Sequence, residues 1–229
     1  MNRTAVIFGD SYSVSSNAYG DGDVSTKSWA SYLEADHDFS IHNFAVPGAT
    51  AEDDLEDQLS DYLSVRAKLS ASSSPKTIYY VFFFGINDCG RSEVYFLSEI
   101  VEKIMDAADR LYTEAGARHF TFIDVPPIDR SPGGLERSDP DSIKTRVNTW
   151  NRELQKRVSQ FISKTPKVTV TRFSVHDALS AILDDPEEYD FTEDDTTDQA
   201  GAIWADELHL TSDVHQIIAE KMVECFGTS

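Results

Sequence analysis

Ser11 stands where a strand-like run gives way to a turn. Residues 6–14 read VIFGDSYSV, in which an apolar segment typical of a buried strand ends in Gly9, Asp10 and Ser11, three residues that favour turns. In one interpretation a core strand simply stops there. In the other, the strand holds the Ser11 hydroxyl at the rim of a sheet as a nucleophile. A serine hydroxyl attacks efficiently only when an imidazole removes its proton and a carboxylate orients that imidazole, so the rest of the chain must supply both.

His209 and Asp206 are the pair that best meets this requirement. His209 directly precedes a Thr-Ser-Asp helix start in IWADELHLTSDVHQ, and Asp206 lies three residues upstream. One turn of chain at this spacing can bring the carboxylate to the imidazole, although the same spacing also occurs as a solvated pair on helix surfaces. Four other histidines lie in or beside expected strands or at a helix start, which favours a packing role for each: His37, His42, His119 and His176.

Gly48 and Asn87 follow two further strand-like runs, in NFAVPGATA and FFFGINDCG. A glycine lets a backbone N–H approach a ligand without a Cβ in the way, and an asparagine amide donates hydrogen bonds. Together with the Ser11 N–H, these groups could supply the convergent donors that a developing oxyanion needs. Taken singly, Gly48 and Asn87 are equally typical of turns.

Metal and nucleotide chemistry have little support in the sequence. Asp206, His209, Asp213 and His215 are close together but match no recognised metal-ligand motif, so we expect no metal site. The glycine-rich stretch after Ser11 lacks the lysine of a phosphate-binding loop and the glycine spacing of a dinucleotide fold, so we expect no cofactor. No Gly-x-Ser-x-Gly elbow is present, which argues against the ordinary α/β-hydrolase fold.

Strand-like and helical patterns alternate along the chain, which is typical of a parallel sheet covered on both faces. The pattern predicts one α/β domain over residues 1–229, with a five-stranded parallel sheet in a three-layer α/β/α sandwich. Its turn-rich gaps follow the strands, at the edge where open α/β sheets bind ligands. The acidic stretch 184–198 is expected to be a solvated loop of low order. The expected strands are 4–8, 39–45, 76–84, 119–125 and 167–173, and the helical stripes are 55–66, 94–111 and 143–161, with a last helix after residue 211.

The charge balance disfavours several classes of partner. Forty acidic against twenty basic side chains give a net charge of -20, which repels phosphate backbones and anionic lipid surfaces, so we expect no nucleic-acid partner. No apolar run approaches the roughly 18 residues of a membrane span, so we expect no membrane insertion. Cys89 and Cys225 are expected to be free thiols, and the scarcity of cysteine slightly favours the cytoplasm over a mature secreted form with an added Met. The sequence carries no signal for an oligomeric state.

Four ordered blocks resemble the signature blocks of the SGNH, or GDSL-type, serine esterase and lipase superfamily: FGDSYS, NFAVPGATA, FFFGINDCG and ADELHLTSDVH. The resemblance spans nearly the whole chain and implies a flavodoxin-like fold. It implies Ser11 as nucleophile, His209 as base and then acid, and Asp206 as the orienting carboxylate, with Ser11, Gly48 and Asn87 forming the oxyanion hole. DVPPIDRSPGG is similar to a loop of the plant and fungal branch, which includes carbohydrate acetylesterases.

The expected function is therefore hydrolysis of short-chain, chiefly acetyl, esters through an acyl-enzyme, with acetylated carbohydrates as first candidates. Lipase, thioesterase or acyltransferase activity on the same site, and a non-catalytic carbohydrate-binding relative, remain alternatives. Many family members have His-Pro-Thr where this chain has His209, Leu210 and Thr211, and leucine lacks the fixed backbone angle of proline. Three aromatic residues could line the pocket or pack in the core: Tyr12, Trp150 and Trp204.

Overall fold

Five parallel strands form the central sheet, in the order β4-β1-β5-β6-β7. The computed structural model describes residues 3–14, 17–18, 25–69 and 78–227, so part of the predicted loop after Ser11 and the first two residues of the predicted strand 76–84 lie outside the described residues. Numbered along the sheet, the order is that of the flavodoxin-like doubly wound fold, which confirms the predicted fold class. The strands are β1 (Arg3–Gly9), β4 (Phe39–Asn43), β5 (Ile78–Phe83), β6 (His119–Ile123) and β7 (Thr169–Phe173).

Burial differs between the middle and the edge of this sheet. Strands β1 and β5 pair in register from Thr4↔Ile78 to Gly9↔Phe83, and both are almost wholly buried because helices cover both faces. Strand β7 lies at an edge and buries only Phe173 completely. The near-continuous apolar sequences of β1 and β5 follow from this two-sided burial.

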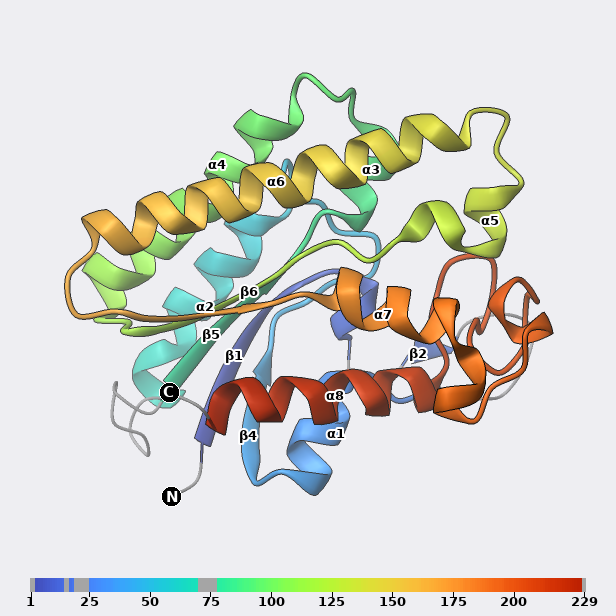
Figure 1. The fold of residues 1–229 in the computed structure, drawn as a ribbon. Helices are drawn as coiled ribbons and strands as arrows, with labels where there is room; N and C mark the ends of the chain where they lie inside the picture. The colour runs from blue at the N-terminus through green and yellow to red at the C-terminus, as the bar shows by residue number, and fades with distance from the viewer. Residues whose placement is uncertain (1–2, 15–16, 19–24, 70–77, 228–229) are drawn as a thin grey trace.

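Helices cover the sheet on both sides (Figure 1). Helices α1 and α8 pack together on one face with α7 beside α8, and α2, α4 and α6 lie on the other. The three predicted helical stripes correspond to α2, α4 and α6, and the last helix begins at Ser212 as predicted. The helices are α1 (Trp29–Asp36), α2 (Leu55–Leu69), α3 (Ile86–Arg91), α4 (Leu97–Arg110), α5 (Pro132–Leu135), α6 (Pro140–Lys164), α7 (Val175–Asp184) and α8 (Ser212–Gly227).

The acidic stretch differs from its prediction. It is mostly exposed, as expected, but it forms two short 3-10 turns, Pro186–Tyr189 and Asp194–Thr196. Asp195 organises the second turn, because its carboxylate accepts hydrogen bonds from the Thr192 hydroxyl and N–H and from the Ala202 N–H. The prediction of low order is therefore wrong: local side-chain-to-backbone bonds give this polar segment a defined path.

Other short elements complete the fold. A two-stranded ribbon pairs β2 (Asn17–Ala18) with β3 (Ser25–Thr26), a π-helical turn Leu111–Ala115 extends α4, and 3-10 turns occupy Ser11–Ser13 and Ile128–Arg130. In the part of the chain that the structure describes, no helix has both the length and the apolar character needed to cross a membrane. The single-domain interpretation of residues 1–229 stays a prediction.

Candidate active site

Ser11 lies at the carboxyl end of β1, an interior strand of the sheet. The strand ends at Gly9, and Asp10 begins a 3-10 turn by accepting a hydrogen bond from the Tyr12 N–H at 3.0 Å. Gly9 is required for a steric reason: a Cβ there would lie 2.7 Å from the Phe83 carbonyl oxygen and 2.9 Å from the Ser13 Oγ. The sharp change from strand to turn brings the Ser11 side chain to the rim, where it is 7 % exposed.

Gln58 holds this junction from the helical layer. Its side-chain amide, on α2, accepts from the Gly9 N–H at 3.0 Å and donates to the Gly9 carbonyl at 2.9 Å. The amide therefore pairs with Gly9 as a neighbouring strand would. Gln58 is buried, so this exchange also satisfies its own polar atoms.

Ser11, His209 and Asp206 form one hydrogen-bonded series. The Ser11 Oγ lies 2.9 Å from the His209 Nε2, and the His209 Nδ1 lies 2.7 Å from the Asp206 Oδ2. With Nδ1–H donating to the carboxylate, the neutral imidazole presents Nε2 as an acceptor to the serine hydroxyl. The structure thus brings the predicted residue Ser11 to His209, 198 residues further along the chain, and to the nearby Asp206.

The Asp206 carboxylate also fixes the backbone around His209. Its Oδ1 accepts from the N–H groups of Leu208 and His209, at 2.7 and 2.6 Å. Burial alone raises the pKa of Asp206, but the hydrogen bonds from the His209 side chain and from the two backbone N–H groups outweigh it and lower the pKa to about 2. The group is therefore an anion at neutral pH.

Backbone pairing fixes the segment around His209, which has Leu210 in place of the proline that the resemblance leads one to expect. Trp204 and Leu210 form an antiparallel bridge, in which the Ala205 N–H donates to the His209 carbonyl at 2.7 Å. Leu210 is fully buried, and the Tyr12 hydroxyl donates to the Leu208 carbonyl at 2.6 Å. These contacts restrain the segment without the ring of a proline.

Gly48 lies on the loop after β4 and Asn87 in the first turn of α3, and both segments are tied to this edge of the sheet. The Val46 N–H donates to the Gly9 carbonyl at 3.1 Å, and the Asn87 Nδ2 donates to the Ala49 carbonyl at 3.0 Å. Gly48 has φ +75°, a left-handed conformation that favours glycine, and none of the described residues accepts a hydrogen bond from its N–H. One Asn87 amide proton is held by Ala49, which leaves the second for a ligand.

Comparison with known proteins places the chain in a family. Residues 6–222 match the family described as GDSL-like Lipase/Acylhydrolase. The chain belongs to this family. It is thereby a carboxylic ester hydrolase, as the sequence predicted.

Individual relatives of this GDSL hydrolase are distant. An acetylesterase of Thermothelomyces thermophilus is 23% identical over 88% of this chain and 75% of its own length. A thermolabile hemolysin of Vibrio parahaemolyticus is 24% identical over 86% of this chain, which spans only 54% of that relative. The crystal structure of an acetylxylan esterase from Geobacillus stearothermophilus has a TM-score of 0.58 at 15% identity, covering 98% of this chain and 94% of that one. At that identity, the structural likeness shows the fold alone.

A cavity of about 410 Å³ opens next to Asn87 and to the segment between Asp206 and His209. Asn87 lines it, and so do Glu207 and Leu208 of that segment. Further lining comes from the segments around Arg91, Ser131 and Arg137. Of the aromatic residues considered for the pocket, Tyr12, Trp150 and Trp204 are all buried in the core and line none of the cavities described here.

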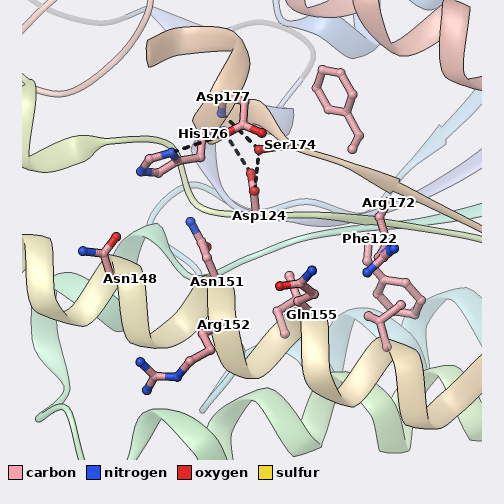
Figure 2. A pocket seen from close by; sticks show the side chains of 13 residues that line it. Phe122, Asp124, Asn148, Asn151, Arg152, Gln155, Arg172, Ser174, His176 and Asp177 are labelled. Atoms are coloured by element: carbon pink, nitrogen blue, oxygen red, sulfur yellow. Dashed lines mark hydrogen bonds and ion pairs between the residues drawn. The ribbon is translucent and has the colours of Figure 1, made fainter. Parts of the chain in front are cut away.

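A second cavity, of about 480 Å³, lies at the far edge of the sheet between α6 and β7 (Figure 2). Asp124, at the end of β6, accepts hydrogen bonds there from the Ser174 hydroxyl and the His176 N–H, at 2.7 and 2.9 Å. These contacts tie the end of one strand to the first turn of α7. Within residues 3–14, 17–18, 25–69 and 78–227, no cluster of three or more His, Cys, Asp or Glu side chains that could hold a metal ion is found.

Buried carboxyl groups support the site and were missed in the sequence. Asp88 accepts from the N–H groups of Ala51 and Glu52, both at 3.1 Å, and so holds the loop that carries Gly48. Burial raises the pKa of Asp88 to about 6. Burial also raises the pKa of Asp10 to about 8, against the Tyr12 N–H bond and with the help of Asp88. Their only signal was an acidic residue in an apolar context.

Gln58 had a clearer signal that sequence reasoning could have used. Leu55, Gln58, Leu59 and Tyr62 follow a helical stripe, and a polar residue inside such a stripe must find a buried partner. Cys89 and Cys225 are thiols and do not form a disulfide with each other, in agreement with their prediction.

Proposed function

We propose that this GDSL hydrolase cleaves short-chain, chiefly acetyl, esters through an acyl-enzyme, with Ser11 as nucleophile. The single observation that carries the proposal is the order of hydrogen bonds, from the Ser11 Oγ to the His209 Nε2 at 2.9 Å and from the His209 Nδ1 to the Asp206 Oδ2 at 2.7 Å. This order allows one imidazole to remove the serine proton while the carboxylate stabilises the resulting cation.

The reaction follows from these contacts. The Ser11 Oγ attacks the ester carbonyl carbon, and its proton passes to the His209 Nε2. The negative charge that forms on the carbonyl oxygen is held by the N–H groups of Ser11 and Gly48 and by the free Asn87 amide proton. The C–O bond to the alcohol breaks as His209 returns the proton to that oxygen. Water, deprotonated by His209, then releases the carboxylic acid and restores the serine.

The cavity beside Asn87 supports a small acyl group on a polar alcohol. Charged side chains border it, namely Arg91, Glu136, Arg137 and Glu207, and their desolvation by a long acyl chain would be costly. Acetylated carbohydrates fit this polar lining. The names of two relatives, an acetylesterase and an acetylxylan esterase, point to the same substrate class.

Covalent trapping tests the nucleophile and the acyl preference together. A serine-directed organophosphate should label the peptide that contains Ser11. A slowly hydrolysed acetyl ester should protect Ser11 from this label better than free acetate does. Among p-nitrophenyl esters, kcat/KM should be higher for acetate than for octanoate. A label on another peptide would overturn Ser11 as nucleophile, and a preference for octanoate would favour the lipase alternative.

A further inference from the structure

Two arginine side chains stand apart from the rest in their lack of partners. Among the arginines within the described ranges, only Arg91 and Arg172 have side chains without a hydrogen bond, an ion pair or an aromatic ring as partner. Both are exposed, and each lines one of the two cavities described above. In a chain with forty acidic side chains, an unpaired guanidinium is available to a ligand.

Arg91 lies next to the groups proposed to hold the oxyanion. It is four residues after Asn87 on α3, so both side chains project from the same face of that helix. Its Nη2 lies 3.8 Å from the point that a Cβ on Gly48 would occupy, so the guanidinium reaches over the Gly48 turn. A substrate bound through these donors would therefore have a cation beside its ester group.

The other charges of this cavity differ in their availability. Arg137 is already near Asp139, with 3.7 Å between its Nε and the carboxylate oxygen. Glu136 and Glu207 are exposed, and within the described residues neither carboxylate has a hydrogen-bond or ion-pair partner. The cavity thus offers one free planar cation and two free carboxylate acceptors.

This set of groups distinguishes between classes of ester. A planar guanidinium pairs best with a carboxylate through two parallel hydrogen bonds, and free carboxylates accept hydrogen bonds from hydroxyls. A neutral sugar would satisfy the glutamates but would leave Arg91 without an anion. An aliphatic chain would satisfy neither. A sugar acid carries both a carboxylate and several hydroxyls.

We propose that Arg91 makes this enzyme selective for acetyl esters of sugar acids, by binding the ring carboxylate while Glu136 and Glu207 accept hydrogen bonds from the ring hydroxyls. The inference rests on the proposed function, since it concerns the substrate of the same site. The net charge of -20 repels anions at long range, so the selectivity arises from the local contact with Arg91 and not from steering.

The test compares two sugars that differ only at the carboxylate. Glucuronic acid and glucose, acetylated at the same hydroxyl, are used as substrates of the full chain. The wild-type protein should show kcat/KM about tenfold higher for the acid at low salt, mostly through a lower KM, as a charge-assisted hydrogen bond allows. Raising the salt to about 0.5 M should reduce this ratio, because the pair is exposed.

Two matched variants assign the preference to one arginine. Arg91→Gln should bring the ratio to about one, whereas Arg172→Gln, which removes the unpaired arginine at the far edge of the sheet (Figure 2), should keep the wild-type ratio. An equal loss in both variants would show a general charge effect and would overturn the assignment to Arg91. A wild-type ratio of one would overturn it as well.

Failure of this inference can be told from failure of the proposed function. If wild-type protein hydrolyses p-nitrophenyl acetate and the neutral sugar ester but shows no preference for the acid, the role of Arg91 alone is refuted. If it hydrolyses none of these esters, the proposed acetylesterase function fails, and the selectivity proposal fails with it.

Discussion

Two places at the carboxyl edge of the sheet each bring together a serine, a histidine and an aspartate, yet their hydrogen bonds run in different orders. After β1, the Ser11 Oγ meets the imidazole of His209 at 2.9 Å, and the imidazole meets the carboxylate of Asp206. The histidine ring stands between the other two groups, so it can accept a proton from one side while the anion balances its charge from the other.

After β6 and β7, the same three residue types make a helix cap. The Ser174 hydroxyl donates directly to the Asp124 carboxylate and also accepts from the Asp177 N–H, and His176 joins through its backbone N–H (Figure 2). The imidazole does not stand between the serine and the aspartate. Ser174 therefore serves as the N-cap of α7, and the comparison shows that the order of contacts, and not the presence of three residue types, decides what such a group can do.

The largest expected difference between the two places lies in their serines. Ser11→Ala should lower kcat/KM for p-nitrophenyl acetate by at least about 10⁴-fold, because it removes the hydroxyl that lies 2.9 Å from the His209 Nε2 and is proposed to form the acyl-enzyme. Ser174→Ala is the matched control: it should keep full activity and lower the free energy of unfolding by about 1 kcal/mol through the lost cap. Wild-type rates in the Ser11 variant would refute the comparison.

The next largest expected difference is between the effects of replacing the two aspartates. Asp206→Asn should lower kcat by about 10³- to 10⁴-fold, since an amide in place of the carboxylate favours the wrong imidazole tautomer and cannot balance the cation. Asp124→Asn should leave kcat near that of the wild type while destabilising the fold. Steady-state kinetics and urea unfolding of both variants measure these effects on kcat and on stability. An equal loss of kcat in the Asp124 variant would contradict the comparison.

Asn87 gives a further test of the first place, since its amide is one of the proposed oxyanion donors there. Asn87→Ala should lower kcat by about 10²-fold with a smaller change in KM, because the amide is used most strongly in the transition state. Its contact with Ala49 makes some loss of stability expected, so the melting temperature is measured alongside. A rise in KM with unchanged kcat would assign Asn87 to ground-state binding instead.

The smallest expected effect is the opposite pH dependence of stability at the two carboxyl groups. Burial raises the pKa of Asp124 to about 6, against the Ser174 and His176 hydrogen bonds and the nearby imidazole, with a small further rise from Asp177. As pH rises, Asp124 therefore keeps its proton to a higher pH in the folded chain than in the unfolded chain. The contribution of the protonated Asp124 to the free energy of unfolding is complete below about pH 4 and is lost as pH rises through about 6. For Asp206, with a pKa of about 2, the contribution is complete above about pH 4 and is lost as pH falls through 2.

Urea titrations at several pH values separate these two contributions. In the wild type, the free energy of unfolding should fall by about 1 to 3 kcal/mol between about pH 4 and 6 because of Asp124, and Asp124→Asn should remove this fall. Asp206→Asn should remove only the fall in the free energy of unfolding that occurs as pH drops below about 4. Parallel curves for the wild type and the Asp124 variant across that window would contradict the raised pKa.

Much of the fold could be predicted because its signals are local. The apolar runs of β1 and β5 and the helical stripe of α6 depend on neighbouring residues along the chain, and so does the His209 segment before α8. The candidate residues Ser11 and His209 were found because each ends or precedes such an element. Their contact across 198 residues became expected only through the resemblance of four blocks taken together.

The features that were missed depend on contacts between distant segments. The partner of Gln58 lies 49 residues away and that of Asp88 lies 37 away, and no periodicity in the sequence joins them. The segment of helix α3 was expected to be a turn because Gly85 precedes it and Gly90 lies within it, whereas its packing against α6 stabilises a short helix there. Tertiary packing overrode the local preference.

Because Gln58 makes two hydrogen bonds to Gly9, substitutions on the buried face of α2 should affect turnover. A library that diversifies Leu55, Gln58 or Leu59 would disturb the strand end that carries Ser11, although all three side chains are buried. Substrate engineering is better confined to the exposed border at Arg91 and Glu207, where new side chains can be sampled without altering the reacting atoms.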